Sequence, residues 1–133
     1  MEDLFRFPAA RRQDPEVEQW FAHGDALRGL VEPWFERLRA CGLDVAELIH
    51  DGRPTACAGD AAFAYVDAHA VHANIGFFFG AFLDDPAGLL EGAGKRMRHV
   101  KLRIDRMPDE GALDDLITAA YRDIRRRLDD ARP

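Results

Sequence analysis

The alternation of apolar and polar residues predicts two long β-strands, over residues 71–80 and 97–104. In the first strand the odd positions are all apolar: Val71, Ala73, Ile75, Phe77 and Phe79. In the second strand the same alternation runs through Val100, Leu102 and Ile104. Successive side chains of a strand point to opposite faces of a sheet. Each strand is therefore expected to bury one apolar face and to leave one polar face open.

Apolar residues spaced three and four apart predict amphipathic helices toward both ends of the chain. We expect a short helix over residues 14–24 and a longer one over 25–42, which Pro33 should kink or interrupt. A last helix is expected over 109–128, where acidic residues come first and arginines last, as the helix dipole favours. A further short helix is expected over 84–92, because two aspartates and a proline stand at its start.

Short turns rich in glycine and proline predict further strands before the two long ones, at 55–59 as an edge strand and at 61–66. Strands joined by such brief turns pair antiparallel, since a parallel connection needs a dozen or more residues. The pattern predicts an α+β fold, a two-layer sandwich in which N- and C-terminal helices pack on one face of an antiparallel meander sheet. Residues 1–13 are expected to form an N-terminal arm, and residues 14–133 a single domain.

Composition narrows the classes of function. The chain has 133 residues, which corresponds to one domain, and a formal net charge of −6, which argues against nucleic-acid binding. No apolar run approaches the roughly 20 residues that span a bilayer, and the N-terminus lacks the apolar segment of a signal peptide. A cytoplasmic protein without a membrane contact is therefore expected.

The sequence also limits the chemistry that the protein performs. It contains no serine, which excludes every serine-nucleophile mechanism, and no nucleophile–base pair is recognisable. Cys41 and Cys57 lie far apart without metal-ligand spacing and are expected to be free thiols, with Cys41 buried and Cys57 either an ordinary or a reactive thiol. A non-enzymatic binding module is expected.

The polar face of the two long strands is the first candidate site. It is expected to present an aromatic side chain among basic and polar ones: His72, Asn74, Phe78, His99, Lys101 and Arg103. Aromatic and arginine side chains dominate the energetics of protein interfaces, so this face is predicted to dock a protein partner or a second copy of the chain. The alternative is that Phe5 or Phe7 of the N-terminal arm covers Phe78.

The second candidate is a small-molecule or anion site on the basic strand between Lys95 and Arg103. Six lysine or arginine residues stand between Lys95 and Arg106 against the single acid Asp105. The glycines before Lys95 do not make a phosphate loop, because Arg96 stands where such a loop needs serine or threonine. A cleft with convergent polar groups is expected if this second prediction holds.

Histidines offer a third, weaker candidate. His69 and His72 are three residues apart, so on one strand they point to opposite faces and cannot share a metal unless His69 lies in a turn. His72 reaches His99 only if the two long strands pair directly. Exposed polar side chains are the default expectation for all three histidines.

Several segments resemble the YdhG-like domain of unknown function. They are Glu47-Leu48-Ile49 with Gly52 and Pro54, Ala64-Tyr65, His72 to Phe77, Gly88-Leu89-Leu90-Glu91-Gly92 with Gly94-Lys95, and Val100-Lys101-Leu102. The resemblance covers roughly residues 27–128 and implies a frataxin-like fold, with two helices against an antiparallel sheet. One class of members has been treated as intracellular iron chaperones, so iron enters as an implied ligand.

The residues that the resemblance offers for iron are Glu32, Glu36, Asp44 and Glu47. Arg28, Arg37 and Arg39 are interleaved with them. Hard cations need several converging oxygen ligands, and neighbouring arginines compete with a metal for the carboxylates. The resemblance thus implies iron binding, whereas the residue chemistry does not favour it.

Overall fold

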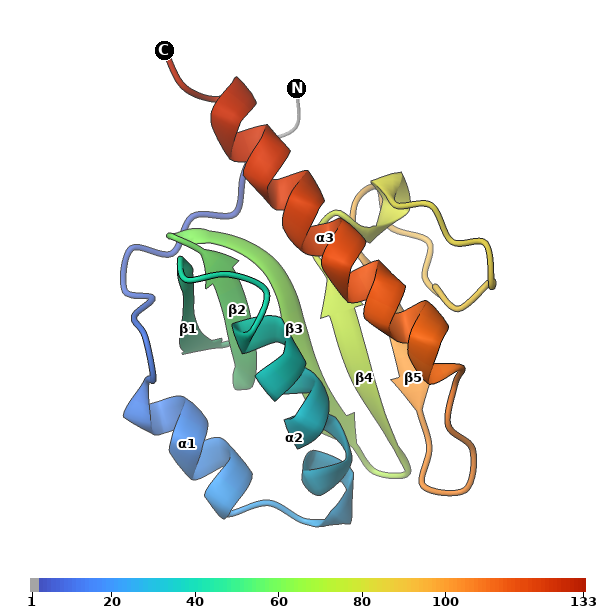
Figure 1. Ribbon diagram of the computed structural model, residues 1–133. Coiled ribbons are helices and arrows are strands. Elements are labelled where there is room, and N and C mark those ends of the chain that lie inside the picture. The colour runs from blue at the N-terminus through green and yellow to red at the C-terminus, as the bar shows by residue number, and fades with distance from the viewer. Residues whose placement is uncertain (1–2) are drawn as a thin grey trace.

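Residues 3–133, described by a computed structural model, form two layers, a five-stranded antiparallel sheet with helices on one face (Figure 1). The helices are α1 (Pro15–Ala22), α2 (Ala26–Arg39) and α3 (Glu110–Asp130), with a short 3-10 helix, η1 (Gly80–Phe82). The strands are β1 (Val45–His50), β2 (Arg53–Ala58), β3 (Ala61–His69), β4 (His72–Phe77) and β5 (Arg98–Leu102). They pair in sequence order, so the sheet is the predicted meander and the predicted fold class is confirmed.

The apolar faces of the sheet and of the two long helices make the core. β4 and β5 turn Ala73, Ile75, Phe77, Val100 and Leu102 inward, all at most 2% exposed. α2 and α3 meet them with stripes that are fully buried: Val31, Phe35 and Leu38, then Leu113 and Ile117. Because these residues follow the strand and helix periods, the sequence predicted them from spacing alone.

Aspartate side chains begin all three α-helices. Asp14, Asp25 and Asp109 accept hydrogen bonds from the main-chain N–H of Glu16, Arg28 and Ala112, at 2.9, 3.0 and 2.9 Å. Such caps satisfy N–H groups that have no partner within the helix. α2 continues through Pro33 without the interruption that was expected, so its stripe reaches Leu38. None of the helices in residues 3–133 combines the length and the apolar character needed to cross a bilayer.

One predicted helix is absent, and one predicted strand has another place in the sheet. No helix forms over residues 84–92, because the Asp85 carboxylate accepts hydrogen bonds from the N–H groups of Leu89 and Leu90, and Gly88 has a φ of +67°. The 55–59 segment belongs to β2, which is not an edge strand, since β1 pairs with its other side. β1 escaped the sequence pattern because one of its inward positions holds the charged residue Glu47.

Glu47 is buried, at 2% exposure, and joins three parts of the chain, β1, α2 and the start of α1. Arg39 of α2 donates two hydrogen bonds to its carboxylate, Nε to Oε1 at 2.6 Å and Nη2 to Oε2 at 2.8 Å. The main-chain N–H of Asp14, at the start of α1, donates a third to Oε2 at 3.1 Å. Arg39 also contacts Glu18 and Glu36, and its pKa is raised, first by the hydrogen bonds to Glu47. This ion pair fixes α1 and α2 against the β1 edge.

We expect the substitution Arg39→Met to lower the free energy of unfolding by about 3 kcal/mol, because it leaves the Glu47 carboxylate buried without its cation. Urea denaturation followed by circular dichroism measures the change. The double substitution Arg39→Met with Glu47→Met should recover most of the loss, since both charges are then absent. Arg12→Met, at an exposed position, should stay within about 0.5 kcal/mol of the parent. A loss for Arg39→Met no larger than that control would contradict the assignment.

Candidate functional site

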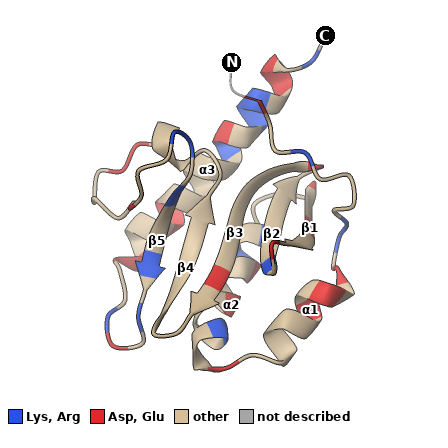
Figure 2. Cartoon of the chain, turned by 180° about the vertical axis from the view of Figure 1, so that it is seen from behind, with Lys and Arg blue, Asp and Glu red and all other residues tan. Residues whose placement is uncertain are grey.

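Figure 2 shows the sheet face that lies opposite the helices, here called the back face, with the N-terminal arm running beside β1 to α1. The rings of Phe5 and Phe7, on this arm, cover part of the back face. The arm is hydrogen-bonded to β3 at its start, where Ala62 N–H donates to the Phe5 carbonyl at 2.9 Å. It is bonded to β1 further on, where Arg11 and Glu47 exchange two main-chain hydrogen bonds of 2.9 Å. Main-chain bonds at both ends of the arm make it part of the fold, and they leave the β4–β5 side of the back face open.

Phe78 is the predicted site residue that the arm removes from the surface. It is only 4% exposed, and its ring lies 4.9 Å from that of Phe5 and 6.4 Å from that of Phe7. The ring of Tyr65 packs against it at 5.8 Å. The prediction of an exposed Phe78 is therefore wrong and the alternative, a Phe78 covered by the arm, is right. The physical reason is that aromatic rings of the arm and the sheet bury each other's apolar surface.

The other predicted site residues lie on the open part of the back face or at its border. Asn74 is paired with Lys101 across β4 and β5, and Gly76 with His99. Arg103 follows β5 directly and is exposed. The Oδ1 atom of Asn74 is shielded from solvent and accepts no hydrogen bond from any residue in the described part of the chain. The structure thus groups His72, Asn74, His99, Lys101 and Arg103, and separates them from Phe78.

The histidines do not form a metal site. His69 ends β3 and His72 begins β4, and the two are direct partners across a two-residue turn, so they share a face. This is the exception that the sequence left open, a turn at His69. Their ring centroids are 5.8 Å apart, and His69 Nε2 lies 3.1 Å from an Asp67 oxygen. His99 faces Gly76, four residues from His72, or about 13 Å along the strand. Within residues 3–133 no three His, Cys, Asp or Glu side chains converge.

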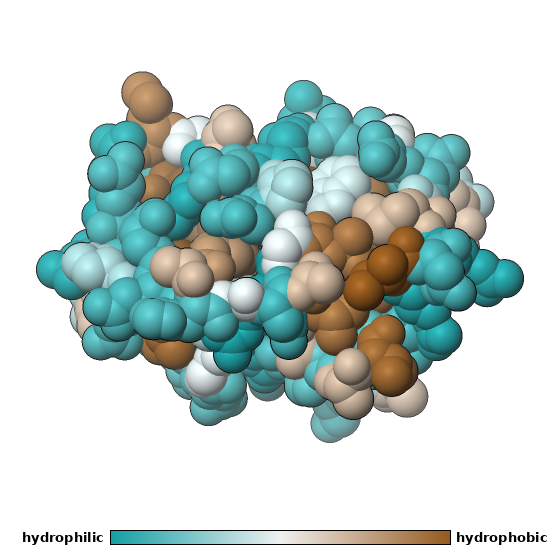
Figure 3. Space-filling view, turned by 90° about the horizontal axis from the view of Figure 1, so that it is seen from below, coloured by the Kyte–Doolittle hydropathy of each residue, from teal (hydrophilic) through white to brown (hydrophobic). Residues whose placement is uncertain are grey.

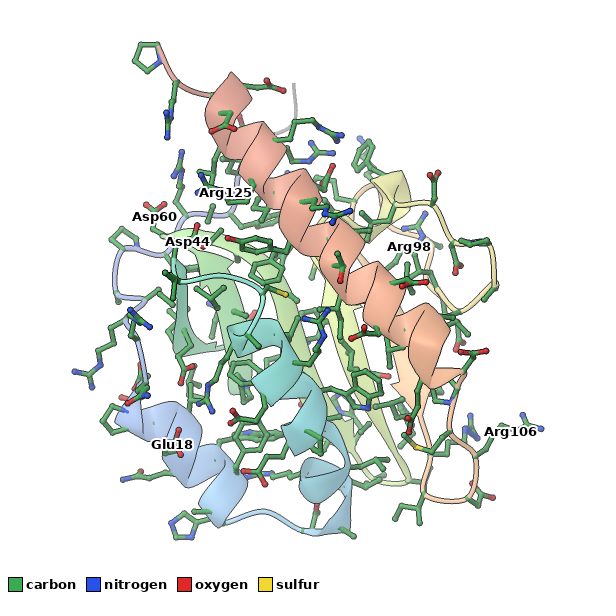
Figure 4. The ribbon with its side chains drawn as sticks, viewed as in Figure 1. Glu18, Asp44, Asp60, Arg98, Arg106 and Arg125 are labelled. Atoms are coloured by element: carbon green, nitrogen blue, oxygen red, sulfur yellow. The ribbon has the colours of Figure 1, made fainter. Side chains whose placement is uncertain are left out.

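The acidic residues that the family resemblance offered for iron are spread over the helical side. Glu36 and Glu47 both contact Arg39, and Asp44 accepts hydrogen bonds from Tyr121 and from Arg125, the latter at 2.8 Å. Glu32 lies exposed on α2. Figure 4 shows Asp44 and Arg125 close together beside α3, far from Glu18 on α1. Arginines and a tyrosine occupy three of the four carboxylates, so these acids do not form an open oxygen cage.

The two cysteines are free thiols held inside the fold. Cys57 has no exposed surface, and burial raises its pKa to about 12. Cys41 is half-buried, and burial likewise raises its pKa, against the opposing effect of Arg37. Both sulfurs are therefore protonated at neutral pH, which keeps them from acting as nucleophiles.

A cleft of about 380 Å³ opens at the outer edge of β5. Its charged lining consists of Lys101, Arg103, Arg106 and Glu91, and its apolar walls include Leu89, Met107 and Pro108. Two loops enclose it. The loop before β5 is fixed by paired main-chain hydrogen bonds between Glu91 and His99, of 2.8 and 2.9 Å. The loop after β5 is fixed by a tight turn from Arg103 to Arg106.

The cleft has an excess of positive charge. Arg103 and Arg106 are exposed and have no ion pair within residues 3–133, and the Lys101 ammonium lies 3.8 Å from a Glu91 oxygen. Figure 4 shows Arg106 projecting outward from the connection between β5 and α3. The sequence placed Lys101 and Arg103 in a candidate site, but it did not place Arg106 or Glu91 there. Arg106 belongs to the basic run that starts at Lys95, so that run was the signal for it.

Comparisons with protein-family models, with curated proteins and with solved structures find no match. The site is therefore interpreted from its own geometry.

The environment of His72 yields a pH prediction. Desolvation, then the charge of Lys101, lowers its pKa from the ordinary 6.5, with smaller effects from His69, Arg103 and His99. The unfolded chain therefore binds more protons than the folded one as the pH falls below 6.5, and His72 should lower the stability there. We expect Lys101→Met to raise the His72 pKa, measured by NMR titration of the imidazole protons. Arg12→Met should leave it unchanged, and an unaltered pKa in Lys101→Met would contradict this placement.

Proposed function

We propose that this protein is a binding module for an anionic ligand, which it holds in the cleft at the outer edge of β5. The observation that carries the proposal is that Lys101, Arg103 and Arg106 all line one cleft, and that Arg103 and Arg106 have no ion pair within residues 3–133. The chain has a net charge of −6, so its surface as a whole does not attract anions. Anions are therefore expected to bind at the local cationic cleft.

The chemistry of the lining suits binding. Two guanidinium groups offer forked donors that match carboxylate or phosphate oxygens, and the lysine adds a mobile point charge. The cleft is open to water, so we expect each contact to be modest and sensitive to salt. Glu91 is the opposing charge, and its contact with Lys101 limits affinity for anions that carry a single charge.

The other two functions considered from sequence have less support. Docking of a protein on the back face was argued from an exposed Phe78, and that ring is buried. Iron handling, and the YdhG-like family itself, stay predictions from the resemblance. Three of the four acids implied for iron, Glu36, Asp44 and Glu47, are engaged by arginines. The anion proposal depends neither on iron nor on the family.

The test is a titration of the purified protein with pyrophosphate at low salt, followed by isothermal calorimetry and by amide chemical shifts. We expect shifts to gather at residues 88–91 and 100–108, and the double substitution Arg103→Ala with Arg106→Ala to weaken binding at least tenfold. Both positions are exposed, so the variant should fold normally. Arg12→Ala with Arg132→Ala removes the same charge from exposed positions outside the cleft and should keep the parent affinity. Equal affinities in all three proteins, or no binding at millimolar pyrophosphate, would overturn the proposal.

A further inference from the structure

The outer edge of β5 has a gap in its main-chain hydrogen bonding. His99 directs both its N–H and its C=O away from β4, to Glu91. Main-chain groups two residues apart on an antiparallel strand point to the same side, so the N–H and C=O of Lys101 also point away from β4. Arg103, two residues further on, again bonds outward, to Arg106. Lys101 stands between these two bridges, and within residues 3–133 no main-chain group bonds to it from that side. One donor and one acceptor of the sheet thus face the cleft.

The gap has the dimensions of a short piece of extended chain. From His99 to Arg103 is four residues, or about 13 Å along a strand. An unpaired N–H next to an unpaired C=O requires both an acceptor and a donor, and a peptide unit supplies both. A free carboxylate supplies acceptors alone.

Side chains around the gap define the composition of that extended chain. A residue paired with Lys101 places its side chain on the back face, the side to which Lys101 and Arg103 point, and an acid there meets two cations. Its neighbours in the extended chain point to the opposite face, where Met107 and Pro108 lead into α3. Apolar side chains fit there.

Exposed apolar residues continue beside the cleft. Val71, Ile104 and Met107 are 76%, 65% and 40% exposed, and residues 71 and 104 stand two positions beyond the last β4–β5 pair, Ala73 with Leu102. Figure 3, which views this end of the molecule, shows hydrophobic side chains gathered on it. A partner with alternating acidic and apolar residues therefore finds complementary charge in the cleft and apolar surface next to it.

We infer that the cleft binds an extended acidic peptide segment of a partner protein, which adds to the outer edge of β5 as a short strand paired with Lys101. This inference rests on the proposed function and names the ligand class for the same site. Strand addition takes affinity from main-chain hydrogen bonds and specificity from alternate side chains. Here the main-chain bonds form at Lys101, and the specificity comes from Arg103, Arg106 and the apolar walls.

The test uses three blocked pentapeptides of the same charge. The parent is Glu-Val-Glu-Val-Glu; one analogue is N-methylated at its three glutamates and the other at its two valines. In an extended chain the glutamate N–H groups all point to one edge, so the first analogue cannot donate to the Lys101 carbonyl while the second still can. We expect the glutamate-methylated peptide to bind at least tenfold more weakly than the other two, by calorimetry. The parent should also slow hydrogen exchange of the Lys101 amide at least tenfold.

Two protein variants test whether the peptide binds beside Lys101. Glu91→Gln removes the carboxylate that competes for Lys101 and should tighten binding of the parent peptide about threefold. Arg12→Gln, at an exposed position on the arm beside the opposite edge of the sheet, should have no effect. Equal binding of all three peptides without protection of the Lys101 amide overturns the inference, yet the anion proposal survives if pyrophosphate still binds through Arg103 and Arg106. Failure of pyrophosphate and of every peptide to bind overturns both.

Discussion

The arrangement of the N-terminal third of the chain depends on the buried ion pair between Glu47 and Arg39. A carboxylate at 2% exposure is costly unless a cation and hydrogen-bond donors surround it, and here Arg39 and the Asp14 N–H do so. Because the partners come from β1, α2 and the start of α1, satisfying this one group fixes the relative positions of all three. The N-terminal arm follows, since Arg11 bonds to the main chain of the same Glu47.

The position of the arm in turn divides the back face. Phe5 and Phe7 cover Phe78, against which the ring of Tyr65 also packs, so this side becomes a second small apolar layer. The β4–β5 side keeps polar residues that are partly exposed. A sheet with helices on one face alone would have left the entire back face available to a partner. Here the accessible chemistry is displaced toward β5, the strand that is farthest from the arm.

β5 is an edge strand of the sheet, and the cleft lies along its outer edge. Edge strands expose unpaired main-chain groups, and proteins usually cover them to prevent unwanted pairing. In this chain the loops around Glu91 and Arg106 cover the two ends of the edge and leave the Lys101 segment between them open. An edge shortened in this way, and bordered by cations, selects against long apolar strands while it still accepts a short acidic one.

The sequence by itself determined the fold class, the helix caps and the inward-facing residues of β4, β5, α2 and α3, because strand and helix periods are local properties of the chain. It also located Lys101 and Arg103 through the basic run. Only the tertiary structure decided that Phe78 is covered, that β1 forms around a buried Glu47, and that residues 84–92 make a loop that encloses a cleft. Each of these depends on specific side-chain or main-chain contacts, namely Phe5 with Phe78, Arg39 with Glu47, and Asp85 and Glu91 with the main chain of Leu89 and His99, and periodicity carries no information about such contacts.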